Sequence, residues 1–326
     1  MDPATFFAQS RLVIVAGKGG VGKTVVTAAL ARAASLAGHS ALVVEVEGSS
    51  GLGGHFGRPP LTYDEVELLA AGADGTEGWV RGRAVTADAA LLEYLREHGL
   101  ARVSKRLLAS GVLDVVSTAA PGLRDILVLG KVKALEREGG ADVVLLDAPA
   151  AGHAITFLLS ARGLLDAINV GPINAQARDV LELLTDPSRC QVMLVALPEE
   201  TPVNELVDTA FHLEDRVGVA LGPVVVNALL PATGDLAVDP TTAAAEAGVT
   251  LRPGEADALA AAAAFRRDRS AMQAEQLARL AEALPLPQLH LPFLFSASLG
   301  PAELDVLARA LLDGLATVPA PAGTGG

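Results

Sequence analysis

One glycine-rich segment near the start of the chain has residue types and spacing that could bind a phosphate group. Residues 17–24 read GKGGVGKT and fit the pattern GxxxxGK[ST]. The apolar run Leu12–Ala16 precedes the segment, and a helical pattern, Thr24–Ala37, follows it. In this strand-to-helix context we expect Lys23 to meet the β- and γ-phosphates and Thr24 to ligate Mg²⁺. Glycines without a Cβ let backbone N–H groups converge on phosphate oxygens. The amides expected to do so are those of Gly19, Gly20, Val21 and Gly22.

Short aliphatic runs separated by helical patterns would position this loop. The runs mostly lack strict polar–apolar alternation, as expected for strands covered on both faces. The predicted strands are Leu12–Ala16, Ala41–Val46, Asp142–Leu146, Gln191–Ala196 and Pro223–Asn227, with Leu289–Leu291 as a candidate last strand. The predicted helices are Thr24–Ala37, Ala154–Leu165, Ile173–Thr185, Thr201–Glu214, Ala256–Leu284 and Pro301–Leu315. This alternation predicts an α/β fold with a doubly wound, mostly parallel sheet of the P-loop NTPase type.

The alternation breaks between Phe56 and Gly140, where no strand pattern is convincing and amphipathic helical patterns dominate. The last of these patterns, Leu123–Leu135, is apolar on two faces, which is typical of a helix that is deeply buried or that awaits a partner. We therefore expect a single P-loop domain over residues 1–318, a helical insertion over residues 58–140 within it, and a flexible tail over residues 319–326.

Composition excludes several classes of protein. The 326 residues are 51% hydrophobic and 19% charged, a balance that excludes disorder and leaves room for a large core. A net charge of -13 disfavours nucleic acid as a partner. The single cysteine, Cys190, excludes an internal disulfide and suits a reducing compartment. No apolar stretch approaches the ~18 residues that span a bilayer, and no signal peptide is recognisable. We expect a cytoplasmic protein without direct membrane insertion.

A second lysine, Lys18, makes the loop more specific. It resembles the deviant Walker A motif of the class that contains MinD, ParA, nitrogenase iron proteins and the ArsA ATPases. In those families this lysine reaches across a dimer interface to the nucleotide of the partner subunit. The resemblance implies that Lys18 acts in trans as a catalytic residue, in a dimer that closes on ATP.

Later segments resemble the ArsA and tail-anchored-protein-targeting ATPases in particular. Residues 147–153, DAPAAGH, are similar to that family's switch II segment, and residues 198–205 look like its PEE…E stretch. Residues 224–227, VVVN, and 291–294, LPFL, resemble segments beside the base. The resemblance implies that Asp147 helps Thr24 to hold Mg²⁺ and that Asn227 contacts adenine. It also implies that Pro292 and Phe293 lie beside the base.

The switch I segment, residues 45–57, departs from the family pattern STDPAHxLxDxFG. Glu47 replaces the first aspartate and keeps a carboxylate, so it is our candidate catalytic residue there, with Glu45 as a possible substitute. Gly54 stands where targeting ATPases carry the aspartate that orients the attacking water, a group whose loss slows phosphoryl transfer. The family's metal-binding CxxC and arsenite-binding cysteines are absent, so thiol-based arsenite sensing is excluded and dimerisation must use other contacts.

Three functional hypotheses remain open. The leading one is an ATP-hydrolysing dimeric switch with ATP and Mg²⁺ as cofactors, which couples nucleotide state to a hydrophobic client helix or a membrane-protein partner. The second, which Gly54 favours, is a catalytically impaired nucleotide-binding subunit that pairs with an active paralogous ATPase. The third is a small-molecule kinase or ligase that uses the same loop. The sequence leaves open whether the partner subunit is a second copy or a paralogue.

Overall fold

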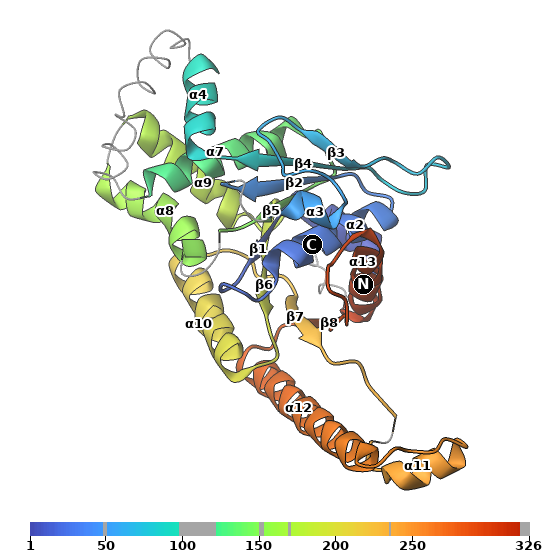
Figure 1. Cartoon of the computed structure of the whole chain (residues 1–326). Coiled ribbons are helices and arrows are strands. Elements are labelled where there is room, and N and C mark those ends of the chain that lie inside the picture. The colour runs from blue at the N-terminus through green and yellow to red at the C-terminus, as the bar shows by residue number, and fades with distance from the viewer. Residues whose placement is uncertain (48–50, 98–121, 150–152, 169–170, 235, 320–326) are drawn as a thin grey trace.

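The computed structural model describes residues 1–47, 51–97, 122–149, 153–168, 171–234 and 236–319 (Figure 1). Its centre is an eight-stranded sheet in the order β3-β4-β2-β5-β1-β6-β7-β8. Strand β3 is antiparallel to β4, and every other neighbouring pair is parallel. The strands are β1 (Leu12–Ala16), β2 (Ala41–Val46), β3 (Val66–Leu69), β4 (Val80–Val85), β5 (Val143–Asp147), β6 (Cys190–Ala196), β7 (Val224–Leu229) and β8 (Gln288–Pro292). The predicted α/β fold class and mostly parallel sheet are confirmed.

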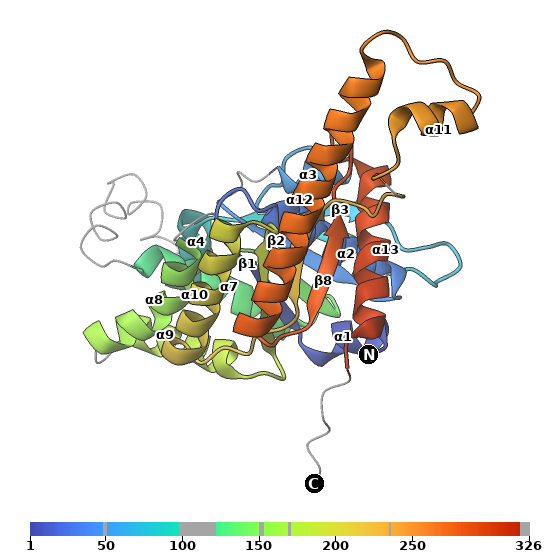
Figure 2. The same ribbon diagram turned by 90° about the horizontal axis from the view of Figure 1, so that it is seen from below.

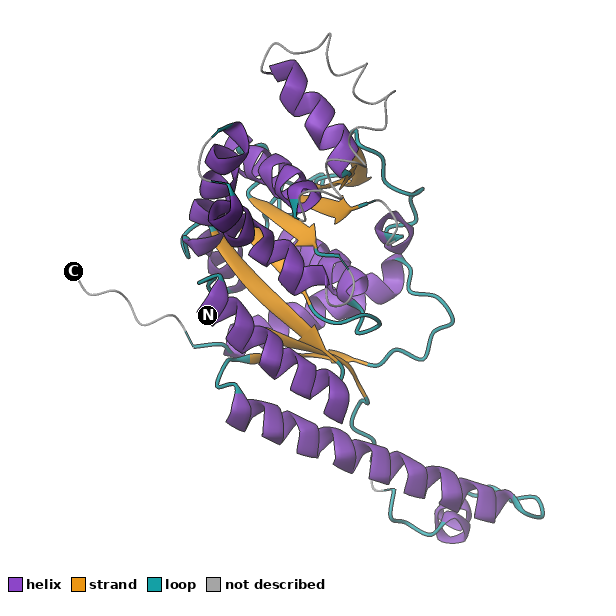
Figure 3. Ribbon diagram, turned by 90° about the vertical axis from the view of Figure 1, so that its left-hand side faces the viewer, coloured by secondary structure: helices purple, strands orange, loops and turns teal. Residues whose placement is uncertain are grey.

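Helices cover both faces of this sheet (Figure 3). The described helices are α1 (Pro3–Gln9), α2 (Lys23–Leu36), α3 (Leu52–His55), α4 (Ala87–Glu97), α7 (Leu123–Glu138), α8 (His153–Ala167), α9 (Pro172–Thr185), α10 (Glu200–Arg216), α11 (Pro240–Glu246), α12 (Glu255–Ala283) and α13 (Pro301–Thr317). Helices α2 and α13 pack on one face, and α7 to α10 pack on the other. Within the described ranges, no helix combines the length and apolar character needed to cross a bilayer.

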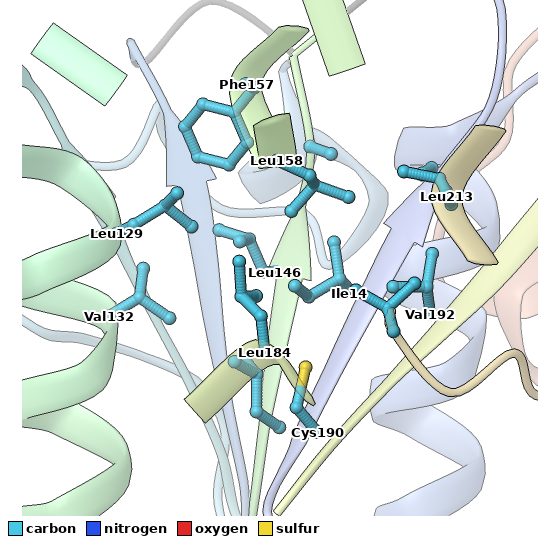
Figure 4. Close-up of a cluster of buried hydrophobic side chains, with 14 of the residues drawn as sticks. Ile14, Leu129, Val132, Leu146, Phe157, Leu158, Leu184, Cys190, Val192 and Leu213 are labelled. Carbon is cyan, nitrogen blue, oxygen red and sulfur yellow. The ribbon is translucent and has the colours of Figure 1, made fainter. Parts of the chain in front are cut away.

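The alternating side chains of the buried strands supply both layers of the core. In β1, Ile14 faces the layer of α7 to α10, whereas Val13 and Val15 face the layer of α2 and α13. Figure 4 shows the first layer, where Ile14 lies among side chains such as Leu146 and Leu158. Because both faces are buried, these strands are aliphatic at nearly every position. The rigid sheet fixes where each strand ends, and the loops at those ends carry the site.

The prediction that residues 58–140 form an insertion without strands is wrong. Strand β4 pairs in parallel with β2 along its whole length, and β3 pairs antiparallel with β4. The pattern was missed because β4 contains Arg81, Gly82 and Arg83. Each arginine lies over an aromatic ring, Arg81 over the nearby Trp79 at 4.6 Å and Arg83 over the more distant Tyr63 at 4.7 Å, so these ring contacts accommodate charges that look unsuited to a strand. Residues 98–121 of this segment lie outside the described residues.

The remaining predicted elements agree closely with the structure. Helix α7 is buried along two sides, by Leu123 and Ile126 on one and by Val132 and Leu135 on the other, which confirms that its apolar faces belong to the core. Helix α12 behaves differently, because it extends from the sheet and carries α11 beside its far end (Figures 1 and 2). Most of the predicted tail, residues 320–326, lies outside the described residues.

Candidate functional site

The glycine-rich loop lies between the carboxyl end of β1 and the start of α2, as predicted. Two of its glycines are required by their surroundings. A Cβ on Gly17 would lie 2.5 Å from the carbonyl oxygen of Val195, and a Cβ on Gly22 would lie 2.3 Å from Nδ2 of Asn227. Gly22 also has a φ of 89° and forms the N-cap of α2. The helix therefore begins immediately after the loop, with its positive end available to an anion.

Lys23 is the first residue of α2 and is 7% exposed. Its Nζ donates to the carbonyl oxygen of Lys18 at 3.1 Å, which leaves other N–H groups for a ligand. Burial lowers the pKa of Lys23, and the nearby carboxylate of Asp147 partly opposes this by raising it. A desolvated ammonium at a helix N-terminus suits a polyanionic phosphate chain.

Thr24 and Asp147 meet beside the loop. Thr24 Oγ1 donates to Asp147 Oδ2 at 2.8 Å, and Thr27 Oγ1 lies 3.5 Å from Asp147 Oδ1. Asp147 ends β5 and is in register with Val15 of β1, so the parallel pairing brings its carboxylate to the loop. A hydroxyl and a carboxylate are hard oxygen ligands of the kind that Mg²⁺ prefers. These two residues fit the predicted Mg²⁺ site.

Glu47 contacts residues of β4 and α7. It follows β2 with a φ of 65°, and its N–H donates to the carbonyl oxygen of Val85 at 3.0 Å. Its half-exposed carboxylate lies 4.0 Å from Arg124 at the start of α7, and Arg124 is 3.8 Å from Asp88. The structure therefore links Glu47 to the first turn of α7. Residues 48–50 and 150–152 of the two switch segments lie outside the described residues.

Gly54 and Glu45 are the other two residues of the predicted switch I. Gly54 lies in the one-turn helix α3, and a Cβ there would meet no atom within 4 Å. Glu45 is buried and in register with Asp147 on the neighbouring strand. The structure thus leaves space for a larger side chain at Gly54.

Lys18 lies at the surface of the loop. Its Nζ forms an ion pair with Glu205 of α10 at 3.2 Å, and both side chains are about one third exposed. Its predicted action on the nucleotide of a partner subunit stays a prediction.

Asn227 is tied to the phosphate loop. Its Nδ2 donates to the carbonyl oxygen of Val21 at 3.0 Å, and its Oδ1 accepts from the N–H of Ala228 at 2.9 Å. The side chain therefore joins β7 to the loop. Its predicted contact with adenine stays a prediction.

Pro292 and Phe293 lie at the end of β8. Pro292 is in register with Leu229 of β7, and the N–H of Phe293 donates to the carbonyl oxygen of Leu229 at 2.6 Å. The ring of Phe293 lines a pocket of about 800 Å³. This pocket is bounded by the segments that leave β6, β7 and β8 and by one side of α12.

Sequence reasoning missed the α12 side of this pocket. The residues that α12 contributes include Phe265, Arg266, Arg269 and Gln273. No motif marks them, because their position depends on how a long helix crosses the ends of strands far away in the sequence. Gln273 holds the segment that follows β7, because its Oε1 accepts from the N–H of Leu230 at 3.0 Å. Arg269 forms an ion pair with Glu199.

Comparison with known proteins supports the predicted relationship. Residues 10–168 match the model of a family described as anion-transporting ATPase, ArsA type. The ATPase BagA of Mycobacterium tuberculosis is 32% identical over 301 residues, which cover 86% of this chain and 87% of BagA. The arsenical pump-driving ATPase of Escherichia coli is 29% identical over 220 residues, 66% of this chain and 34% of that protein. That of Acidiphilium multivorum is 28% identical over 224 residues, 68% of this chain and 35% of that protein. These similarities agree with the phosphate loop and the mostly parallel sheet, and the chain belongs to the ArsA family of anion-transporting ATPases.

Proposed function

We propose that the protein is an ATP-binding and ATP-hydrolysing switch that works as a dimer with Mg²⁺. The observation that carries this proposal is the hydrogen bond between Thr24 and Asp147 beside the desolvated ammonium of Lys23. Loop, ammonium, hydroxyl and carboxylate together provide ligands for both a phosphate chain and a divalent cation.

Each residue of the site has a role in phosphoryl transfer. Lys23 and the amides of residues 19–22 bind the β- and γ-phosphates, and Thr24 and Asp147 hold the cation. Bound Mg²⁺ supplies neutralisation of the negative charge on the phosphate oxygens. Catalysis of this kind depends on positioning and electrostatics, so the pre-formed contact between Thr24 and Asp147 contributes by reducing the reorganisation that binding requires.

Two features support coupling between the nucleotide and helices α7 and α8. Glu47 follows β2 and lies beside Arg124 at the start of α7. Asp147 ends β5, and the chain enters α8 at His153 only six residues later. Rearrangement of either switch would therefore act on a helix of the α7 to α10 layer. Such coupling requires that ATP bind one arrangement more tightly than the other, and a client helix or membrane protein is the proposed recipient.

Gly54 supports a second candidate function. Within the described residues, Glu47 is paired with Arg124, and Gly54 offers no carboxylate to orient water. These two features suit a nucleotide-binding subunit with little turnover of its own, paired with an active paralogue. This candidate shares the phosphate loop and the Mg²⁺ site and differs only in the catalytic step.

Phosphate release by the purified protein, measured with and without Mg²⁺, tests the proposal. Lys23→Ala should abolish ATP binding, whereas Asp147→Asn should retain weak ATP binding but lose its Mg²⁺ dependence. Hydrolysis by the wild type that both changes abolish supports the active switch. Tight ATP binding without phosphate release supports the impaired subunit. Undiminished ATP binding by Lys23→Ala would contradict both candidates.

A further inference from the structure

A hollow with a wholly charged lining lies at the opposite edge of the sheet from the phosphate loop. Its volume is about 440 Å³. The residues that line it are Arg11, Lys133, Glu136, Arg137, Asp179, Glu182 and Arg189. Hollows of this size are typical of small-molecule sites, and a lining made of charged side chains suits a small, hydrophilic ligand rather than an apolar one.

The starts of two strands and the sides of two helices bring these residues together. Arg11 immediately precedes β1 and Arg189 immediately precedes β6, and the N–H of Leu12 donates to the carbonyl oxygen of Arg189 at 2.8 Å. Arg137 comes from α7 and Glu182 from α9, and these two helices pack against each other (Figure 1). The phosphate loop follows the other end of β1, after about 16 Å of strand. The hollow is therefore separate from the loop.

Ion pairs hold part of the lining in place. Glu136 is almost fully buried, and its two carboxylate oxygens accept from Arg189 at 3.2 and 2.6 Å. Lys133 of α7 forms an ion pair with Asp179 of α9. These pairs join the two helices to each other and to the start of β6. The walls of the hollow are thus positioned before a ligand binds, which lowers the entropic cost of binding.

Two guanidinium groups of the hollow remain unpaired. Within the part of the chain that the structure describes, the side chains of Arg11 and Arg137 form no ion pair and no hydrogen bond. Arg137 lies in the last turn of α7, where the helix dipole favours a cation, but that interaction uses none of its N–H donors. The lining has four cations and three carboxylates, so it has a positive excess in a chain whose net charge is -13.

The charges of the lining indicate the chemistry of the ligand. An arginine side chain binds a carboxylate or a phosphate group through two parallel N–H donors, so two unpaired arginines can bind two such groups. The three carboxylates of the lining repel a ligand whose negative charge is concentrated in one group. A ligand with separate carboxylates avoids this repulsion, because each of its charges can lie against its own guanidinium.

We propose that this hollow binds a small organic anion with two or three carboxylate groups, and that Arg11 and Arg137 each bind one of them. Glu182 lines the same hollow and can accept a hydrogen bond from a hydroxyl group of the ligand. This assignment does not rest on the proposed nucleotide-binding function, because none of its residues belongs to the phosphate loop or to the switch segments.

Titration calorimetry at constant ionic strength, with succinate, malate and citrate as the probes, tests the assignment. Acetate supplies a single carboxylate for comparison, and inorganic phosphate supplies charge concentrated in one group. The wild type should bind at least one of the three polycarboxylates with a stoichiometry of one per chain. That affinity should exceed the affinities for acetate and for phosphate by roughly tenfold or more.

Four variants locate the binding. Arg11→Gln and Arg137→Gln should each weaken it roughly tenfold or more, and both should keep a melting temperature close to that of the wild type because the two side chains are exposed. Arg309→Gln is the matched control, since it removes an exposed arginine from α13 on the other face of the sheet. It should bind as the wild type does. Lys23→Ala should also do so, because the phosphate loop is not part of the hollow.

Failure of the wild type to bind any of the three polycarboxylates overturns the assignment, and so does phosphate binding that is equally tight. Binding that Arg11→Gln and Arg137→Gln leave unchanged overturns it too, as does binding that Lys23→Ala or Arg309→Gln abolishes. ATP binding by the same preparations tests the proposed function separately, so the two proposals can fail independently.

Discussion

Lys23 shows how a single residue balances stability against ligand binding. Burial lowers its pKa from the ordinary value of 10.5, so the folded protein holds this proton less tightly than the unfolded chain does. Carrying the charge therefore destabilises the ligand-free fold at neutral pH. The penalty fades as the pH rises from the lowered pKa towards 10.5, because the folded state then loses a proton that the unfolded state still holds.

We therefore expect Lys23→Met to raise the free energy of unfolding of the ligand-free protein at pH 7. Its advantage over the wild type should shrink as the pH is raised to 10. Asp147 retains its contacts with Thr24 and Thr27 in this variant. Urea unfolding at several pH values measures the difference, and ATP should no longer stabilise the variant. A variant less stable than the wild type at pH 7 would contradict the argument.

At the scale of elements, the one-turn helix α3 in switch I has room for a substitution at Gly54. Gly54 has an ordinary negative φ, and a Cβ there would meet nothing within 4 Å. Gly54→Asp should therefore fold with a stability close to that of the wild type. By the family pattern, it restores a carboxylate at the position that orients the attacking water.

We expect Gly54→Asp to raise the rate of phosphate release from ATP at least tenfold over the wild type, with ATP affinity little changed. Gly54→Asn is the matched control, since it has the same size without the charge and should give a smaller increase. Single-turnover and steady-state assays separate the chemical step from product release. Equal rates for the wild type and both variants would show that the residue at position 54 does not limit the rate of ATP hydrolysis.

The elements also show why some strands could be predicted and others could not. Strands β1 and β2 were predicted with their observed boundaries, because a parallel strand buried on both faces must be aliphatic almost throughout. Strands β3 and β4 were missed, because Glu67 and the two arginines of β4 break that pattern. Their pairing depends on β2, and Arg83 lies over the ring of Tyr63, so partners outside the local sequence are needed to recognise these strands.

At the scale of the whole molecule, the proposed dimer would depend on what Lys18 contacts. In the single chain it is paired with Glu205 at 3.2 Å, a surface contact of the kind that contributes little to stability. A weak internal partner can give way to the phosphates of a second subunit's nucleotide. If Lys18 acts in trans, its removal should affect turnover without affecting the fold.

We expect Lys18→Ala to bind ATP with near wild-type affinity and to lose turnover by roughly 10³-fold, the scale of an arginine finger. Analytical ultracentrifugation with and without ATP should show an ATP-dependent dimer for the wild type that Lys18→Ala weakens. Glu205→Gln is the control, because it frees Lys18 and should preserve the dimer. Turnover at the wild-type rate by Lys18→Ala would exclude the role in trans.

The sequence by itself determined the phosphate loop, the α/β class and the family, because each rests on residues close together in the chain or on segments in a fixed order. Residues 17–24 specify a loop in which Gly17 and Gly22 have no room for a side chain, and Thr24 and Asp147 meet because parallel strands end at the same edge. The tertiary structure alone decided that Asn227 bonds the loop, that Glu47 lies beside Arg124, and that Arg266 borders the pocket. These contacts join positions far apart in sequence, and only the packing of helices against the sheet sets their distances.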